Sequence, residues 1–147
     1  MGYGPAPSAG SKEADPECSA VHFLLIDDAA VLRAAFKRIA GALGHDVTAV
    51  ADGAEGLRRA AGQDFSAIVV DGRLQDCEFS EYVGALYAAA PQSAIFVIAS
   101  LDERALVARA AAAGAVGAIL RPFRGSQIRD ALAILEPLQP SAAYERN

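Results

Sequence analysis

The sequence VHFLLIDD (residues 21–28) decides the fold, because a short apolar run here ends abruptly in two acidic residues. Runs of this length that are apolar on both faces and rich in β-branched residues are typical of buried parallel strands. Four further runs of this kind follow, at residues 47–51, 68–70, 95–98 and 116–120, the first of them weaker than the others. We therefore expect five buried strands.

Segments with the apolar spacing of helices separate these runs and follow the last one. They lie at residues 31–39, 57–61, 82–87, 106–111 and 128–135. Pro91 ends the third segment, and Gly114 ends the fourth as a C-cap. Strand and helix thus alternate five times, which predicts an α/β fold with a doubly wound parallel sheet flanked by five helices.

The length of 147 residues suits one domain, which we place at residues 21–136. Residues 1–20 are rich in Gly, Pro, Ala and Ser and are expected to form a flexible tail, with a short C-terminal tail at 137–147. The longest wholly apolar run, residues 110–120, is too short to span a bilayer, so we expect no membrane partner.

The net charge of −5 argues against broad nucleic-acid binding, which needs a basic surface to neutralise phosphates. Two cysteines, Cys18 and Cys77, show no metal-ligand spacing and are too few for a disulfide framework. No signal peptide opens the chain. These features favour a soluble protein of the cytoplasm.

Polar residues follow four of the five expected strands. In open parallel sheets, ligands bind beyond the carboxyl ends of the strands. The polar residues at these ends are Asp27, Asp28, Asp71, Ser100 and Arg121. We therefore expect these five side chains to converge on one small region.

Three carboxylates in one place repel one another and resist desolvation. Mg²⁺ would offset this charge, since it prefers a few carboxylates together with retained waters. Asp71 could then act as a carboxylate nucleophile that forms an acyl phosphate, while Arg121 neutralises charge on the phosphoryl oxygens.

Simpler roles compete with this interpretation for each residue taken alone. Asp28 is suited to capping the following helix, and Asp71 precedes a turn-like Gly-Arg pair. Arg121 could be a solvated loop cation. His22 and His45 are expected to have structural roles rather than to carry phosphoryl groups. The conjunction of three acids and a cation at strand ends favours the phosphoryl site.

Three stretches resemble the response regulator receiver domain of two-component signalling. They are LLIDDAAVLRAAFKRIAGALGHDVTAVADGAEGL near the start, IVVDGRLQD in the middle and GAVGAILRPF near the end. The resemblance covers residues 21–136. Within this family, the chain resembles the chemotaxis regulators. The resemblance implies a flavodoxin-like receiver fold with the strand order 2-1-3-4-5.

Carried over by position, Asp27 and Asp28 resemble the acidic pair that holds Mg²⁺. Asp71 resembles the phosphoacceptor, which is also a metal ligand. Arg73 stands where the backbone carbonyl completes the metal shell. Arg121 stands where the family has an essentially invariant Lys.

Other positions of the resemblance concern the loops. Pro122 resembles the family's proline, so the Arg121–Pro122 peptide bond is expected to be cis. A guanidinium at residue 121 keeps the charge of the family Lys, but its fork can bind two oxygens at once. Gln75 and Phe79 stand where the phosphoacceptor loop usually has a proline and a glycine.

The switch residues of the family are changed most. Counting back from Arg121 without a gap places the switch hydroxyl at Ala99, whereas a shift of one residue places it at Ser100. Ala118 replaces the switch aromatic. These changes weaken the usual coupling between phosphorylation and readout.

The resemblance implies a phosphoacceptor rather than an enzyme, with at most self-catalysed phosphotransfer and slow autodephosphorylation. Its partners would be a sensor histidine kinase or a phosphotransfer protein. Residues 137–147 are too few for a DNA-binding domain, so we expect output through a partner protein, through a homodimer formed by the face of the last two helices, or by onward phosphotransfer, the alternative being that the chain is a fragment of a longer protein. The alternative is a pseudo-receiver, a scaffold for protein interactions that is never phosphorylated.

Other enzymes on this fold fit the residues less well. An aspartyl phosphatase needs a second acid two residues after its nucleophile, where this chain has Arg73. A dinucleotide-binding oxidoreductase needs a Gly-rich turn after the first strand, where this chain has Asp27-Asp28-Ala29-Ala30.

Overall fold

The computed structural model describes residues 20–74 and 77–135. Strands and helices alternate along this part of the chain, as the sequence predicts. Apart from Ala20, the expected tails lie outside the described residues, as do Cys18 and Gln75. The elements are β1 (His22–Ile26), α1 (Ala30–Ala42), β2 (Asp46–Val50), α2 (Gly53–Gly62), β3 (Ala67–Asp71), α3 (Phe79–Ala89), β4 (Ala94–Ala99), α4 (Arg104–Ala113), β5 (Gly117–Leu120) and α5 (Gly125–Leu135).

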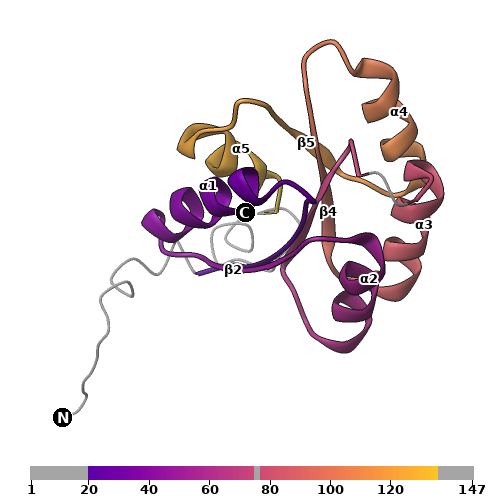
Figure 1. Cartoon of the computed structure of the whole chain (residues 1–147), viewed down its shortest axis with the longest axis horizontal. Coiled ribbons are helices and arrows are strands. Elements are labelled where there is room, and N and C mark those ends of the chain that lie inside the picture. Colours follow the sequence, from indigo (N-terminus) through magenta and orange to yellow (C-terminus); the bar gives the residue numbers. More distant parts are fainter. Residues whose placement is uncertain (1–19, 75–76, 136–147) are drawn as a thin grey trace, which may run out of the picture.

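All five strands are parallel and form one sheet in the order β2-β1-β3-β4-β5. This confirms both the predicted α/β fold class and the strand order implied by the family resemblance. Figure 1 shows α1 and α5 together on one side of the sheet and α2, α3 and α4 on the other. The sheet is therefore covered on both faces, which explains why its strands read as continuous apolar runs.

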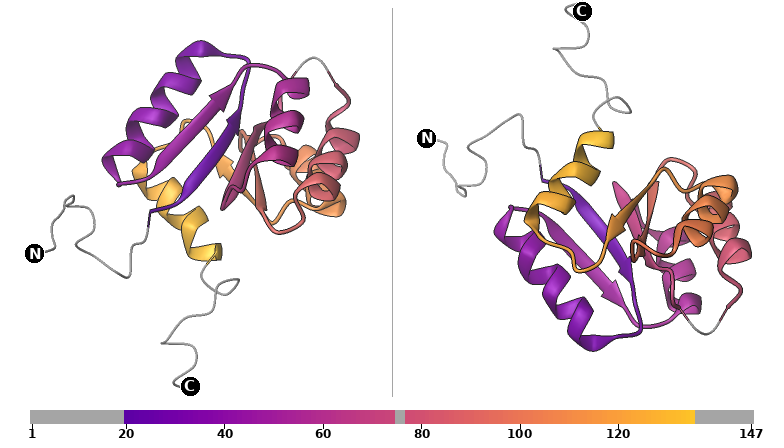
Figure 2. Two further views of the ribbon diagram at one scale, coloured as in Figure 1. Left: turned by 90° about the horizontal axis from the view of Figure 1, so that it is seen from below. Right: turned by 90° about the horizontal axis from the view of Figure 1, so that it is seen from above.

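Successive side chains of each central strand contribute to opposite cores. In β1, Leu24 and Ile26 belong to the cluster beneath α2, α3 and α4, whereas Phe23 and Leu25 belong to the cluster beneath α1 and α5. All four side chains are fully buried. The views from below and above in Figure 2 show α1 and α5 on one side of the sheet and α2, α3 and α4 on the other. A change of strand register by one residue would exchange the two sets of side chains. Because both sets are apolar, the register of the strand depends more on how the side chains fit each core than on their polarity.

Capping residues mark the ends of two helices. The predicted C-cap of α4 at Gly114 is confirmed, with φ 131°, a backbone conformation that glycine adopts without a Cβ penalty. The Asp52 side chain caps α2 by accepting a hydrogen bond from the N–H of Glu55 at 2.8 Å.

The two histidines make structural contacts. The Nδ1 atom of buried His45 accepts a hydrogen bond from the N–H of Val21 at 3.0 Å, tying the start of β1 to the turn before β2. The Nε2 atom of His22 lies 2.8 Å from the hydroxyl of Thr48 on the neighbouring strand. Both contacts agree with the structural roles that we expect for these side chains.

Among residues 20–74 and 77–135, no helix combines the length and the apolar character needed to cross a bilayer.

Candidate functional site

Three carboxylates meet at the carboxyl ends of two neighbouring strands. Asp27 and Asp28 follow β1 directly, and Asp71 is the last residue of β3. Because Ile26 pairs with Val70, the next residue of each strand lies at the same level of the sheet. One oxygen from each of the three carboxylates lies within 4.8 Å of the others. The sheet thus brings these acids together as their positions after the strands predict.

Asp27 is the most constrained of the three acids, with no exposed surface. Its Oδ1 atom accepts a hydrogen bond from the N–H of Ala29 at 2.9 Å, whereas buried Oδ2 has no hydrogen-bond partner among the described residues. Burial, and to a lesser extent the charge of Asp71, raises the pKa of Asp27 from 3.8 to about 6. A buried anionic oxygen without a donor is what a bound cation would satisfy.

The alternative role of Asp28 as a helix cap is not found. Helix α1 has Ala29 as its N-cap, and no side chain caps it. The side chain of Asp28 is exposed and free of this role, while the Oδ1 atom of Asp27 takes the N–H of Ala29 instead. The turn of chain after β1 therefore directs Asp28 toward the acidic cluster rather than onto the end of the helix.

Asp71 is buried, with 3% of its surface exposed, and two donors meet its Oδ1 atom. The guanidinium Nη1 of Arg121 lies 2.9 Å away, and the N–H of Arg73 lies 3.1 Å away. The second contact gives Asp71 the turn role that we considered as its alternative. The carboxylate thus shapes its own loop and also faces a cation.

Arg121 follows β5, and only 11% of its side chain is exposed. Its Nη1 atom pairs with Asp71 and its Nη2 atom with Glu103 at 3.2 Å, so the interpretation of Arg121 as a solvated loop cation is wrong. Its Nε atom is buried and has no hydrogen-bond partner among the described residues. The peptide bond to Pro122 is cis, which confirms that prediction.

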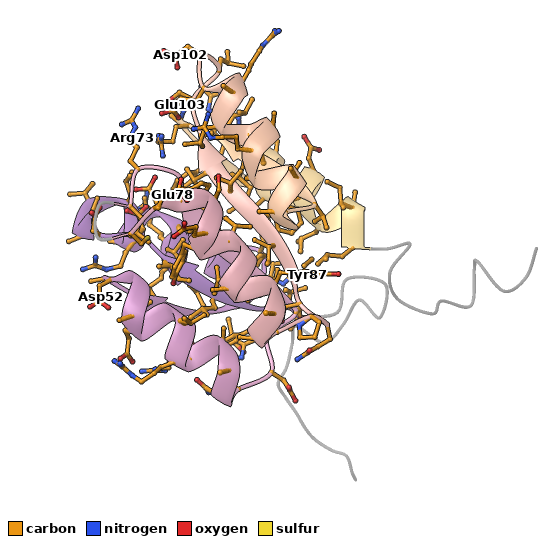
Figure 3. All side chains as sticks on the ribbon, turned by 90° about the vertical axis from the view of Figure 1, so that its right-hand side faces the viewer. Asp52, Arg73, Glu78, Tyr87, Asp102 and Glu103 are labelled. Carbon is orange, nitrogen blue, oxygen red and sulfur yellow. The ribbon has the colours of Figure 1, made fainter. Side chains whose placement is uncertain are left out.

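Glu103 is the residue of this site that the sequence reasoning missed. It lies between β4 and α4, and its Oε1 atom accepts hydrogen bonds from the N–H of Ser100 at 2.7 Å and from Arg121. Its Oε2 atom lies 3.6 Å from Nε of Arg73, and Figure 3 shows these two side chains side by side. The backbone hydrogen bond from Ser100, followed by the two guanidinium charges, lowers the pKa of Glu103 below 4.5. The signal in the sequence is the Ser-x-x-Glu spacing of residues 100–103, half of a capping box.

The two candidates for the switch hydroxyl lie next to each other. Ala99 is the last residue of β4, is fully buried and pairs with Leu120 of β5. Ser100 follows it, and its Oγ atom lies 3.3 Å from Nη2 of Arg73. Ser100 therefore carries the hydroxyl at this strand end. Its role in switching remains a prediction.

An open pocket of about 460 Å³ adjoins the acidic cluster on the side of α1 and β5. Its lining joins cationic and hydroxyl groups to apolar side chains. The lining residues are Leu32, Ala35, Arg73, Ser100, Arg121, Pro122 and Phe123. A cation-lined pocket beside a group of carboxylates can accept an anionic group that approaches Asp71.

The sheet order and the acids at its strand ends agree with the comparison of the sequence with known families. The model of the response regulator receiver domain matches residues 23–133. The chain belongs to this family. A comparison with curated proteins gives no match.

Solved structures of receiver proteins share the fold of this receiver domain. CheY4 of Vibrio cholerae superposes with a TM-score of 0.70 and 22% identity, covering 78% of this chain and 98% of that one. FixJ from B. japonicum gives 0.75 and 23%, covering 86% and 63%. The receiver domain of the sensor histidine kinase PA1611 from Pseudomonas aeruginosa gives 0.69 and 23%, covering 78% and 95%. At these identities the likeness concerns the fold.

Beside Arg121 and Ala99, two further departures from the family pattern fall on described residues. Phe79 is the first residue of α3, and it packs into the core beneath α2, α3 and α4. Ala118 of β5 packs against the same core. Both positions therefore serve packing in this receiver domain.

Proposed function

We propose that this receiver domain accepts a phosphoryl group on Asp71 from a phosphohistidine of a sensor histidine kinase or a phosphotransfer protein. The observation that carries the proposal is the arrangement around Asp71. Asp27 and Asp28 offer carboxylate oxygens within 4.8 Å of it, and the Arg121 guanidinium lies 2.9 Å from its Oδ1 atom. A nucleophilic carboxylate, a cation-binding group and a fixed positive charge are the parts that phosphoryl transfer requires.

The donor set suits Mg²⁺. Asp27, Asp28 and Asp71 would supply carboxylates, and Arg73 would supply its backbone carbonyl. The orphaned Oδ2 atom of buried Asp27 supports this fit, because hard cations take oxygen ligands. When bound, the ion supplies positive charge that lets an anionic phosphoryl group approach the acids. The structure of the PA1611 receiver domain has a magnesium ion in its active-site cleft, and a Burkholderia pseudomallei response regulator has a phosphorylated aspartic acid with calcium.

The transfer itself exchanges one bond to phosphorus for another. A carboxylate oxygen of Asp71 attacks the phosphorus, and the P–N bond to the donor imidazole breaks. The imidazole leaves with the electron pair and takes up a proton from water. Arg121 would donate hydrogen bonds to the phosphoryl oxygens as charge develops on them, and the hydroxyl of Ser100, which lines the same pocket, would donate to the product.

Output would pass through a partner protein, through a homodimer formed by the face of α4 and α5, or by onward phosphotransfer. We place the protein in the cytoplasm, where such kinases present their phosphohistidine. Turnover would be limited to self-catalysed phosphotransfer and slow autodephosphorylation.

One observation favours the second candidate, a pseudo-receiver scaffold. Arg121 already neutralises Asp71 in the structure, and an ion pair between largely buried groups can hold a carboxylate away from chemistry. The test therefore has to separate a paired but reactive Asp71 from an inert one.

Intact-mass measurement after incubation with Mg²⁺ and acetyl phosphate makes this separation. We expect an adduct with the mass of one phosphoryl group, absent from Asp71→Asn and from a sample treated with EDTA. Exposed Asp64 precedes β3 and so lies toward the opposite edge of the sheet from Asp71, and Asp64→Asn is the matched control that should keep the adduct. If neither acetyl phosphate nor a panel of phosphorylated kinases labels the folded protein, the pseudo-receiver is the better description.

A further inference from the structure

The Arg121 guanidinium is held at both of its ends. Its Nη1 atom pairs with Oδ1 of Asp71 at 2.9 Å, and its Nη2 atom pairs with Oε1 of Glu103 at 3.2 Å. The side chain is almost buried, so both contacts are shielded from water. A lysine ammonium is a single nitrogen at the end of a flexible stem and lacks this rigid two-ended geometry.

Glu103 is itself fixed in place. The N–H of Ser100 donates to Oε1 at 2.7 Å, the same oxygen that meets Arg121, and Arg73 lies 3.6 Å from Oε2. Three donors from three different loops thus converge on one carboxylate. A side chain held by backbone and by a second cation can in turn hold Arg121.

We propose that Glu103 is a positioning residue for phosphoryl transfer to Asp71, acting through Arg121. The inference rests on the proposed function and adds a residue to it. Glu103 binds the Nη2 atom of the guanidinium, so the Nη1 atom stays directed at the Asp71 carboxylate. Donors that already point to where charge develops need no reorganisation during transfer, which is the main source of electrostatic catalysis.

Two substitutions of Glu103 separate the effect of its charge from the effect of its hydrogen bonds. In Glu103→Gln the amide oxygen can still accept from Ser100 and from Arg121, although the negative charge is lost. In Glu103→Ala both hydrogen bonds are lost. Asp102→Asn is the matched control, because exposed Asp102 is the preceding residue of the same loop and carries the same charge. Figure 3 labels Asp102 and Glu103 on this loop.

The first readout is the rate of Mg²⁺-dependent phosphorylation by acetyl phosphate. We expect Glu103→Ala to lower the rate about tenfold, Glu103→Gln to recover most of it, and Asp102→Asn to stay within about twofold of the parent, as for residues that orient a reacting group. In an Arg121→Ala background, Glu103→Ala should have no further effect, because a residue that acts only through another is not additive with it.

The second readout does not depend on phosphorylation. In ¹⁵N-labelled full-length protein, NMR spectra should show slow rotation about the Nε–Cζ bond of Arg121, because both ends of the guanidinium are bound. Glu103→Ala should make this rotation fast, and Asp102→Asn should leave it slow. A purely structural Glu103 would not change the rotation of Arg121 selectively.

The outcomes separate the inference from the proposed function. If folded Glu103→Ala is phosphorylated as fast as the parent protein, the proposed role of Glu103 is overturned, and Asp71 remains the phosphoacceptor. Additive rate losses in the Arg121→Ala background also overturn it. Parent protein that no donor phosphorylates overturns both.

Discussion

Replacing Asp27 by Asn should stabilise the metal-free protein while removing its response to Mg²⁺. The Asp27 carboxylate has no exposed surface, and one of its two oxygens has no hydrogen-bond donor. It also lies in the same cluster as two other acids. An asparagine at this position can keep the acceptor for the N–H of Ala29 and carries no charge.

The size of the effect follows from the pKa of Asp27. Because burial raises this pKa from 3.8 to about 6, the folded protein disfavours the ionised carboxylate above pH 6. A rise of about two units corresponds to ~3 kcal/mol, part of which the new amide gives back through its own desolvation. We therefore expect Asp27→Asn to raise the free energy of unfolding at pH 7.5 by about 1–3 kcal/mol, because the substitution removes an unfavourable buried charge. The gain should fade as the pH falls from about 6 to 3.8, because the carboxyl group then becomes neutral by itself.

Urea unfolding followed by circular dichroism, once in EDTA and once in Mg²⁺, measures both parts of this prediction. In EDTA, Asp27→Asn should be the more stable protein. In Mg²⁺ at 100 times its Kd, the parent should gain about 2.7 kcal/mol and the variant little. Asp28→Asn is the matched control: it also loses a proposed ligand, but Asp28 is exposed, so its stability in EDTA should barely change.

A variant that is less stable than the parent in EDTA would refute this reasoning. It would mean that the fold itself stabilises the ionised carboxylate of Asp27, even when no cation is bound. An equal gain in Asp28→Asn would instead point to general relief of negative charge and not to burial.

Three further predictions concern stability alone. Gly84→Ala in α3 should raise the free energy of unfolding by about 0.5–1 kcal/mol, because no neighbour lies within 4 Å of the new Cβ. Gly56→Ala in α2 should lower it by about 1–3 kcal/mol, because its Cβ would lie 2.6 Å from a side-chain atom of Ile26; equal urea midpoints for the two variants would contradict this. Burial lowers the pKa of His45 below 6.5, and its Nδ1 atom accepts from Val21 only when unprotonated, so the folded protein binds fewer protons than the unfolded chain and loses stability as the pH falls below 6.5. The difference in unfolding free energy between the parent and His45→Gln, measured against pH, should shrink over this range, and a constant difference would count against the assignment.

The fold could be predicted from the sequence because its information is local. All the strands except the weaker β2 are runs of mostly apolar residues, and each helix has its own apolar spacing, so the alternation is visible without any long-range contact. The positions of Asp27 and Asp71 follow from the same logic, since an acid after a parallel strand must lie at the carboxyl edge of the sheet. The sequence left open whether Asp28 caps the helix or joins the acids, because that depends on where the first turn of α1 begins, and in the structure the N-cap is Ala29.

The contacts of Arg121 could not be predicted, because they depend on how separate loops approach one another. Asp71 is 50 residues away from Arg121 in sequence and Glu103 is 18, and no periodicity links the three. The Ser-x-x-Glu spacing indicates only that Glu103 turns back toward Ser100. That its carboxylate also faces a guanidinium requires the β4–α4 loop to lie beside the end of β5.

This contact gives a physical reason to treat two unusual features of the site as one. A guanidinium in place of the family lysine brings a second donor edge into a nearly buried position, where an unsatisfied donor is costly. Glu103 satisfies that edge, and its charge balances part of the cation facing Asp71. In Arg121→Lys the single ammonium can serve Asp71 or Glu103 but cannot span both as the fork does, so one carboxylate loses its partner. The loss in the free energy of unfolding caused by Arg121→Lys should therefore be smaller in a Glu103→Ala background than in the parent, whereas two independent features would give the same loss in both.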